Sequence, residues 1–236
     1  MYKKLKVLEL FAGTRCIGKA FDKRGHEVYS IEWDKKHNNI NWYVDIGTIT
    51  TEDIIDRFGI PDVIWASPDC TSYSIAAISH HRIKDDDGNL SPKSDYAKFC
   101  DKVNINVIKI IDDLLKINPN LIYFIENPRG GLRKMNFMKD IPRYTLTYCQ
   151  YGDDRMKPTD IWTNHPDPKF KPPCKNGDSC HVSAPRGSRT GTQGRKNSVD
   201  RSLIPSELCD YVVKICEEEI KWIELYLKIL KKYIIL

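Results

Sequence analysis

The sequence lacks a long apolar stretch, regularly spaced cysteines and internal repeats. No run approaches the roughly 20 apolar residues of a membrane-spanning helix, and the N-terminal MYKKLKVLEL contains no apolar segment of the signal-peptide kind. The eight cysteines occur at irregular spacings, which favours free thiols over a disulfide framework. We therefore expect a protein of a reducing cytoplasm, without membrane association, and we expect it to be a monomer.

Length and charge leave a narrow choice of architecture. A chain of 236 residues can bury one substantial core and a small lobe, but not two full-sized domains. Its 37 basic residues exceed its 32 acidic ones, which gives a net charge of +5. Such a charge is compatible with a polyanionic partner but does not require one.

Short apolar runs alternate with helical stretches from the start to about residue 125. They read KVLELFA, IGKAFDKRG, EVYSIEWD, EDIIDRFG, DVIWASP, INVIKIIDDLLKINP and NLIYFIENP. This order predicts an α/β fold with a parallel sheet and helices on both faces. Ligands of such sheets bind where the strands end, so we expect the site in the turns at 11–18, 32–34, 67–74 and 126–131.

Three further segments stand out. Residues 79–104 are polar and charged, which predicts either a mobile lid or a solvated surface loop. Residues 165–201 are rich in Gly, Pro and Ser and hold eight basic residues against three acids, which predicts either contact with a phosphate backbone or an ordinary loop surface. The C-terminal IKWIELYLKILKKYIIL predicts an amphipathic helix that packs on the domain or on a partner.

The first turn, FAGTRCIG, has features of a cofactor site. Gly13 and Gly18 stand where the backbone must turn tightly before a helix, although an ordinary strand-to-helix turn would look similar. Glu32 ends the next strand about 20 residues on, where a carboxylate can accept hydrogen bonds from ribose hydroxyls. Asp45 in VDIG could bond an adenine amino group. Together these residues predict an adenosyl cofactor without settling which one.

Two residues predict covalent chemistry. Cys70 follows the apolar VIWAS in a proline-containing turn, ASPDCTSYS, so we expect a reactive thiol at the end of the sheet rather than an inert core cysteine. Glu126 in YFIENP also follows a buried strand, where desolvation would raise the pKa of the carboxyl and allow proton donation. Its alternative role is to anchor the following turn.

Five blocks, in this order, resemble the DNA cytosine-5 methyltransferase family. FAGTRCIG resembles the cofactor turn, SPDCTSYS the Pro-Cys nucleophile loop and ENPRGG the Glu-Asn-Val element. QYGDDRMKPT is similar to the later Tyr-Gly and Gln-x-Arg-x-Arg stretch, and RSLIPSELCDYVV to the closing helix that returns to the cofactor pocket. The resemblance spans roughly residues 5 to 215, and five ordered blocks are much less expected by chance than one.

The resemblance implies a Rossmann-like S-adenosylmethionine-dependent methyltransferase fold with a small loop-rich recognition lobe. The small size implies a bacterial or virus-encoded member, and thus the cytoplasm of a bacterial or virus-infected host cell. It assigns nucleophilic addition to Cys70, proton donation to Glu126, and a cation near the base to Arg155 or Lys157, between which the sequence does not choose. The residues implied for cofactor binding are Phe11, Ala12, Gly13, Thr14, Cys16, Gly18, Glu32, Trp33, Asp45, Ile46 and Pro68.

Three positions depart from the family pattern. Asp69 replaces the proline that usually precedes the cysteine, and a carboxylate there opposes thiolate formation. Lys157 and Thr159 stand where the family has arginines. The interval before the closing block is too short for a large target-recognition domain, so we expect limited sequence specificity.

Cys174, Cys180 and His181, with Cys149 as a further candidate, suggest a metal site. Adjacent Cys and His rarely bind one tetrahedral ion, and the short Cys-x-x-Cys steps of zinc motifs are absent. We therefore expect no metal. The alternative is a zinc ion bound by these residues.

The expected organisation is a catalytic core at 1–164, a basic recognition segment at 165–201 and C-terminal helices at 202–236. The expected function is methyl transfer from S-adenosylmethionine to C5 of cytosine in DNA. The alternatives are cytosine-5 methylation of RNA or of a free nucleotide, and a catalytically silent module that binds cofactor or nucleic acid.

Overall fold

A computed structural model describes residues 3–86, 88–183 and 197–234 of the chain. Its centre is a seven-stranded sheet with the strand order β3-β2-β1-β4-β7-β9-β8. The strands are β1 (Lys6–Leu10), β2 (Glu27–Glu32), β3 (Trp42–Tyr43), β4 (Val63–Ala66), β7 (Ile122–Pro128), β8 (Arg143–Thr147) and β9 (Pro158–Thr163). A separate hairpin pairs β5 (Arg82–Lys84) with β6 (Leu90–Pro92).

Strand direction follows the predicted alternation up to β7. The five strands β3, β2, β1, β4 and β7 are parallel neighbours. β9 runs antiparallel to both β7 and β8, so β8 is again parallel to β7. The reversed strand lets β8 and β9 pair directly, because antiparallel strands need no helical crossover.

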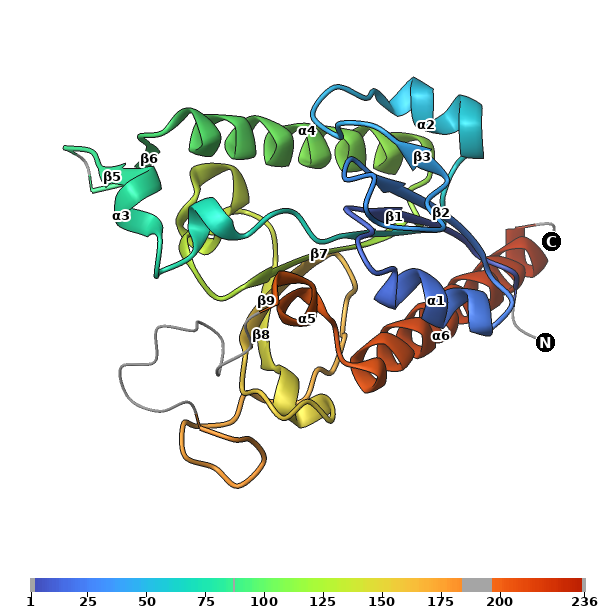
Figure 1. Ribbon diagram of the computed structural model, residues 1–236. Helices are drawn as coiled ribbons and strands as arrows, with labels where there is room; N and C mark the ends of the chain where they lie inside the picture. Colours follow the sequence, from blue (N-terminus) through green and yellow to red (C-terminus); the bar gives the residue numbers. More distant parts are fainter. Residues whose placement is uncertain (1–2, 87, 184–196, 235–236) are drawn as a thin grey trace.

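Helices cover both faces of the sheet, as predicted (Figure 1). They are α1 (Cys16–Lys23), α2 (Thr51–Phe58), α3 (Ile78–His81), α4 (Asp95–Ile117), α5 (Ser198–Ser202) and α6 (Ser206–Ile234). Helices α2 and α4 lie on one face and α1 and α6 on the other. Short 3-10 turns are η1 (Thr71–Tyr73), η2 (Gly131–Lys134), η3 (Asn136–Met138) and η4 (Tyr148–Tyr151).

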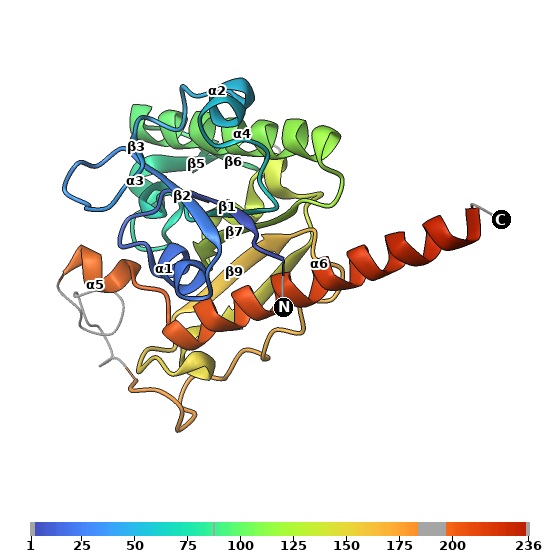
Figure 2. The same cartoon turned by 90° about the vertical axis from the view of Figure 1, so that its right-hand side faces the viewer.

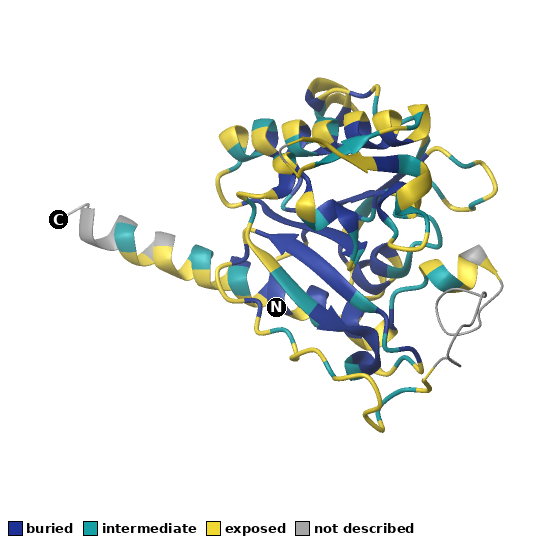
Figure 3. Ribbon diagram, turned by 90° about the vertical axis from the view of Figure 1, so that its left-hand side faces the viewer, coloured by how far each residue is buried: buried dark blue, intermediate teal, exposed yellow. Residues whose placement is uncertain are grey.

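The central strands are buried on both sides because their apolar residues alternate between two cores. In β4, Val63 and Trp65 pack toward α1 and α6, whereas Ile64 and Ala66 pack toward α2 and α4. The strands appear as a dark, buried layer in Figure 3. This burial on both faces explains why the strands read as continuous apolar runs rather than as alternating ones.

The polar stretch and the C-terminal helix differ in extent from what the sequence predicts. The polar stretch 79–104 is not one long loop, because α3, the β5–β6 hairpin and the start of α4 divide it. The C-terminal helix packs on the domain only through its first half, up to Ile220. Beyond that point it projects from the body (Figure 2), and Trp222 and Tyr226 are exposed. Among the residues that the structure describes, none of the helices has the length and apolar character needed to cross a bilayer.

The division of the chain into a core, a basic segment and C-terminal helices stays a prediction. Segment 165–183 forms no helix or strand, α5 begins at Ser198, and the following α6 is a single long helix. Four basic residues of the predicted recognition segment lie outside the described part of the chain: Arg186, Arg189, Arg195 and Lys196.

Candidate active site

The register of the sheet brings the ends of four strands into one row. Leu10 of β1 is paired with Ile31 and with Ala66, and Ala66 is paired with Ile125. The residues that follow these positions, Phe11, Glu32, Ser67 and Glu126, therefore emerge at the same edge. The predicted turns meet there because parallel strands end on the same side of a sheet.

A cavity of about 370 Å³ opens at this edge. From the first two strands come Glu9, Phe11, Ala12, Gly13, Thr14, Cys16, Ile17, Glu32, Trp33 and His37. From the later strands come Trp65, Ser67, Pro68, Asp69, Cys70, Thr71, Glu126, Pro128 and Lys157, and from the closing segment Val199, Arg201, Ser202 and Ile204. Its volume is within the range of about 300–1,000 Å³ that is usual for ligand sites.

The turn after β1 is shaped by unusual backbone angles and by Glu32. Phe11, Gly13 and Arg15 all have positive φ angles, of 56°, 49° and 58°. Residues other than glycine rarely adopt such angles. Oε2 of Glu32 accepts a hydrogen bond from the Gly13 amide at 2.9 Å, and Oε1 accepts from Trp33 and Asp34. The carboxylate is thereby held in the cavity, at the end of β2.

The buried acid Glu9 holds the start of the helix that follows this turn. Oε1 of Glu9 accepts from the Gly18 amide at 2.7 Å, and Oε2 accepts from the Ser30 hydroxyl at 2.7 Å. A Cβ atom at Gly18 would lie 2.4 Å from the Glu9 carboxylate, so the close approach requires glycine. Burial raises the pKa of Glu9, and its hydrogen bonds oppose that shift. Sequence reasoning did not select Glu9, although an acid inside the apolar KVLEL was a usable signal.

The loop that carries Cys70 is held by the ENPRGG segment. Nδ2 of Asn127 donates to the Pro68 carbonyl at 2.9 Å, and Gly130 lies so close to the Tyr73 carbonyl that a Cβ would be 2.5 Å from its oxygen. Arg82, almost fully buried, donates to the Ser72 carbonyl and makes a two-armed ion pair with Asp101. The start of the predicted lid is therefore an anchor for the cysteine loop.

Cys70 is partly buried and lines the cavity. Burial, together with the negative charges of Asp69 and Glu126, raises the pKa of its thiol to about 11, while the positive charge of Lys157 opposes the shift. Asp69 accepts hydrogen bonds from the amide and the hydroxyl of Thr71. It therefore shapes the turn, but its charge still disfavours the thiolate.

The substitution Asp69→Asn is expected to lower the pKa of Cys70, because it removes a nearby negative charge and keeps an oxygen for the Thr71 amide. Below the pKa of about 11 the thiolate fraction rises with pH. Alkylation of Cys70 by iodoacetamide at pH 8 should therefore become several-fold faster, as followed by peptide mass spectrometry. An unchanged alkylation rate would show that the Asp69 charge is already screened.

Glu126 and Lys157 line the same cavity as Cys70. Glu126 is buried, and its Oε1 accepts a hydrogen bond from the Tyr148 hydroxyl at 2.9 Å. Lys157 lies over the Tyr148 ring with Nζ 4.4 Å from the centroid, and donates to the Arg201 carbonyl. Burial lowers the pKa of Lys157, and the Glu126 carboxylate opposes that shift.

Arg155 lies outside this cavity and has a different set of partners. Its guanidinium pairs with Asp153 and donates to the carbonyls of Asp200, Arg201 and Leu203. It is 1% exposed. The side chain thus clamps the segment that leads into α6, and the geometry favours Lys157 as the cation of the site.

Other predicted residues are also placed away from the cavity. Asp45 uses its carboxylate within its own turn, accepting from the Gly47 amide at 2.8 Å. Ile46 is buried in the core beside α2 and α4, and Gly18 is buried against Glu9. The closing segment, by contrast, reaches the cavity through Val199, Ser202 and Ile204, which were not selected individually.

These features define a Rossmann-like methyltransferase: a mostly parallel sheet with one reversed strand near its edge, and a cavity in which an acidic strand end faces a cysteine and a glutamate. The family model of C-5 cytosine-specific DNA methylases matches residues 5–108. The predicted resemblance to the cytosine-5 methyltransferase family is confirmed, and the enzymes of this family use S-adenosylmethionine as their cofactor.

One curated protein and several solved structures are similar to this chain. A "Probable DNA (cytosine-5)-methyltransferase" of Frog virus 3 (isolate Goorha) is 26% identical over 197 residues, which are 81% of this chain and 83% of the relative. The Entamoeba histolytica methyltransferase EhMeth has a similar fold, with a TM-score of 0.51, 15% identity and coverage of 73% of this chain and 57% of that one. The S. pombe Dnmt2 methyltransferase has a TM-score of 0.47, 15% identity and coverage of 68% and 49%. The chain thus spans about half the length of these solved structures.

Proposed function

We propose that the protein transfers a methyl group from S-adenosylmethionine to C5 of cytosine in DNA, through a temporary bond between Cys70 and C6 of the base. The observation that carries this proposal is that two groups of residues line one cavity. The first group is Phe11 and Glu32, and the second is Cys70, Glu126 and Lys157. A cofactor bound at the first would have its reactive end near the second.

The residues present fit the cofactor. The carboxylate of Glu32 stands in the cavity, where it can accept hydrogen bonds from ribose hydroxyls, and the exposed Trp33 offers an aromatic face beside it. The backbone of residues 11–15 turns with left-handed φ angles beside this pair. When bound, S-adenosylmethionine supplies an electrophilic methyl group.

Cytosine C5 is a poor nucleophile, and the side chains of this chain are suited to activate it. In the proposed step the Cys70 thiol gives its proton to the solvent and its sulfur bonds to C6, which moves the C5–C6 electron pair toward C5. Glu126 places a proton on N3 and neutralises the charge that builds on the ring, and Lys157 adds a positive charge close by. C5 would then bond to the methyl group as the methyl–sulfur bond breaks, which leaves S-adenosylhomocysteine. Finally a base removes the C5 proton, N3 returns its proton to Glu126, and the C6–sulfur bond breaks to release the thiolate.

The high pKa of Cys70 makes its activation a separate requirement. With a pKa of about 11 the thiol is protonated at neutral pH. The positive charge of Lys157 lowers that pKa, so substrate binding that favours the protonated form of Lys157 would promote attack. A double-stranded substrate would also have to present its cytosine flipped out of the helix.

DNA as substrate is supported by the name of the viral relative, a probable DNA methyltransferase, and by the basic segment, of which Lys169 and Lys171 are exposed. A location in the cytoplasm of an infected or bacterial cell and a monomeric state remain predictions. The direct test supplies labelled cofactor with duplex DNA, RNA or free cytidine nucleotide. We expect label at C5 of cytosine in DNA. Label in RNA alone, or in the nucleotide alone, would make that molecule the substrate in place of DNA. If the protein binds the cofactor but labels none of the three, a catalytically silent module is favoured.

A further inference from the structure

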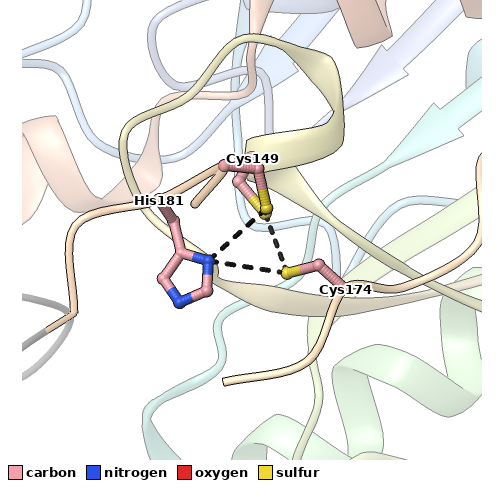
Figure 4. A group of neighbouring side chains, drawn as sticks. Cys149, Cys174 and His181 are labelled. Carbon is pink, nitrogen blue, oxygen red and sulfur yellow. Dashed lines mark hydrogen bonds between the residues drawn. The ribbon is translucent and has the colours of Figure 1, made fainter. Parts of the chain in front are cut away.

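Four potential metal ligands outside the active site meet at the end of the sheet: Cys149, Cys174, Cys180 and His181. Their ligand atoms all lie within 4.8 Å of one another. Figure 4 shows Cys149, Cys174 and His181 turned toward a common point. The residues come from η4 and from two points of the irregular segment after β9, so the cluster is made by the fold and not by a local motif.

The distances within the cluster match a tetrahedral ion. Zinc bonds of about 2.3 Å to sulfur and 2.0–2.1 Å to nitrogen place neighbouring ligand atoms about 3.6–3.8 Å apart. Cys180 Sγ lies 3.6 Å from Cys149 Sγ and 3.6 Å from His181 Nδ1, and Cys174 Sγ lies 3.7 Å from the same nitrogen. Cys149 and Cys174 are closer, with sulfurs 3.1 Å apart, but well beyond the roughly 2.05 Å of a disulfide.

The surroundings also favour a bound ion. The Cys174 amide donates to the Thr147 hydroxyl, and Gln150 Nε2 donates toward the Cys180 sulfur at 3.6 Å. A tight turn, in which Asp178 accepts from the Lys175 amide at 2.7 Å, leads the chain back to the cluster. Such contacts orient metal ligands in structural sites.

We propose that Cys149, Cys174, Cys180 and His181 bind one structural zinc ion. Three thiolates and one imidazole in tetrahedral array are a closed set of ligands that suits zinc and leaves no open position for a substrate. Residues 165–183 contain no helix or strand, so this stretch gains little order from its backbone. The zinc ion ties residues 174–181 of the basic segment to η4.

Metal analysis of the purified chain tests the proposal. Protein prepared without chelators should contain one zinc per chain by mass spectrometry of the metal. After exchange, cobalt should give the visible bands of a tetrahedral ion and a thiolate-to-cobalt charge-transfer band. Cys174→Ser and His181→Ala should lose the zinc, whereas the matched controls Cys216→Ala and His80→Ala, at residues outside the cluster, should keep it.

A second readout does not depend on variants. Removal of the zinc by a chelator should make tryptic cleavage after the exposed Lys175 many-fold faster, and added zinc should reverse the effect. Wild-type protein that is folded yet holds no zinc and develops no cobalt bands would overturn the proposal. A Cys149–Cys174 disulfide in such metal-free protein would also overturn it and assign the cluster to redox chemistry instead. All of these measurements are independent of the methylation substrate.

Discussion

Cys70→Ala is expected to lower methyl transfer by more than about a thousandfold, because it removes the sulfur that the proposed mechanism bonds to C6. Binding of S-adenosylmethionine should be nearly unchanged, since the substitution leaves Phe11 and Glu32, to which we assign the cofactor, in place. Initial rates with labelled cofactor, together with calorimetry of cofactor binding, separate the two effects.

The matched control for this variant is Cys216→Ala, which removes a thiol that is fully buried between α6 and the sheet. It should retain methyl transfer. If Cys70→Ala retains the wild-type rate, covalent catalysis by this cysteine is wrong. If it retains an in vivo effect while the wild type shows no transfer in vitro, the protein is a binding module.

Glu126→Gln should reduce the rate of methyl transfer by about a hundredfold to ten-thousandfold, the usual range for loss of a positioned acid. The amide keeps the size of the side chain and an oxygen for the Tyr148 hydroxyl, but it has no acidic proton to give to N3. The loss should appear in kcat much more than in KM, because the interaction grows as charge builds on the ring.

Tyr148→Phe is the companion to this variant. It removes the hydroxyl that contacts Glu126 and leaves the ring beneath Lys157, so a smaller loss of rate is expected. Equal activity of Glu126→Gln and the wild type, measured in the same substrate assay, would contradict the proposed proton donation and leave Glu126 as an anchor of its turn.

The fold and the outline of the site could be predicted because they depend on local pattern. Apolar runs that end in Phe11, Glu32 and Glu126 mark the strand ends, and parallel pairing brings such ends together. The role of Asp45 stays a prediction, because an acid after a strand can equally close its own turn, as this one does with Gly47. The start of α4 was missed because polar residues dominate its first turn, where Ser94 caps the helix.

Features that depend on distant contacts were out of reach. The sequence could not choose between Arg155 and Lys157, since the choice rests on the three backbone carbonyls that surround Arg155. The same reason applies to the four-residue cluster. Cys174, Cys180 and His181 lack a zinc spacing, and the fourth ligand, Cys149, enters from η4 only when the chain folds.

The most direct test of the account is covalent trapping. The protein and S-adenosylmethionine are incubated with DNA or RNA that contains 5-fluorocytosine, whose fluorine cannot leave as the C5 proton does. The account predicts a complex with DNA that survives denaturation, with the base attached to Cys70 in the peptide mass spectrum. Absence of any adduct in protein shown to bind the cofactor would contradict the covalent mechanism, and an adduct with RNA alone would contradict DNA as the substrate.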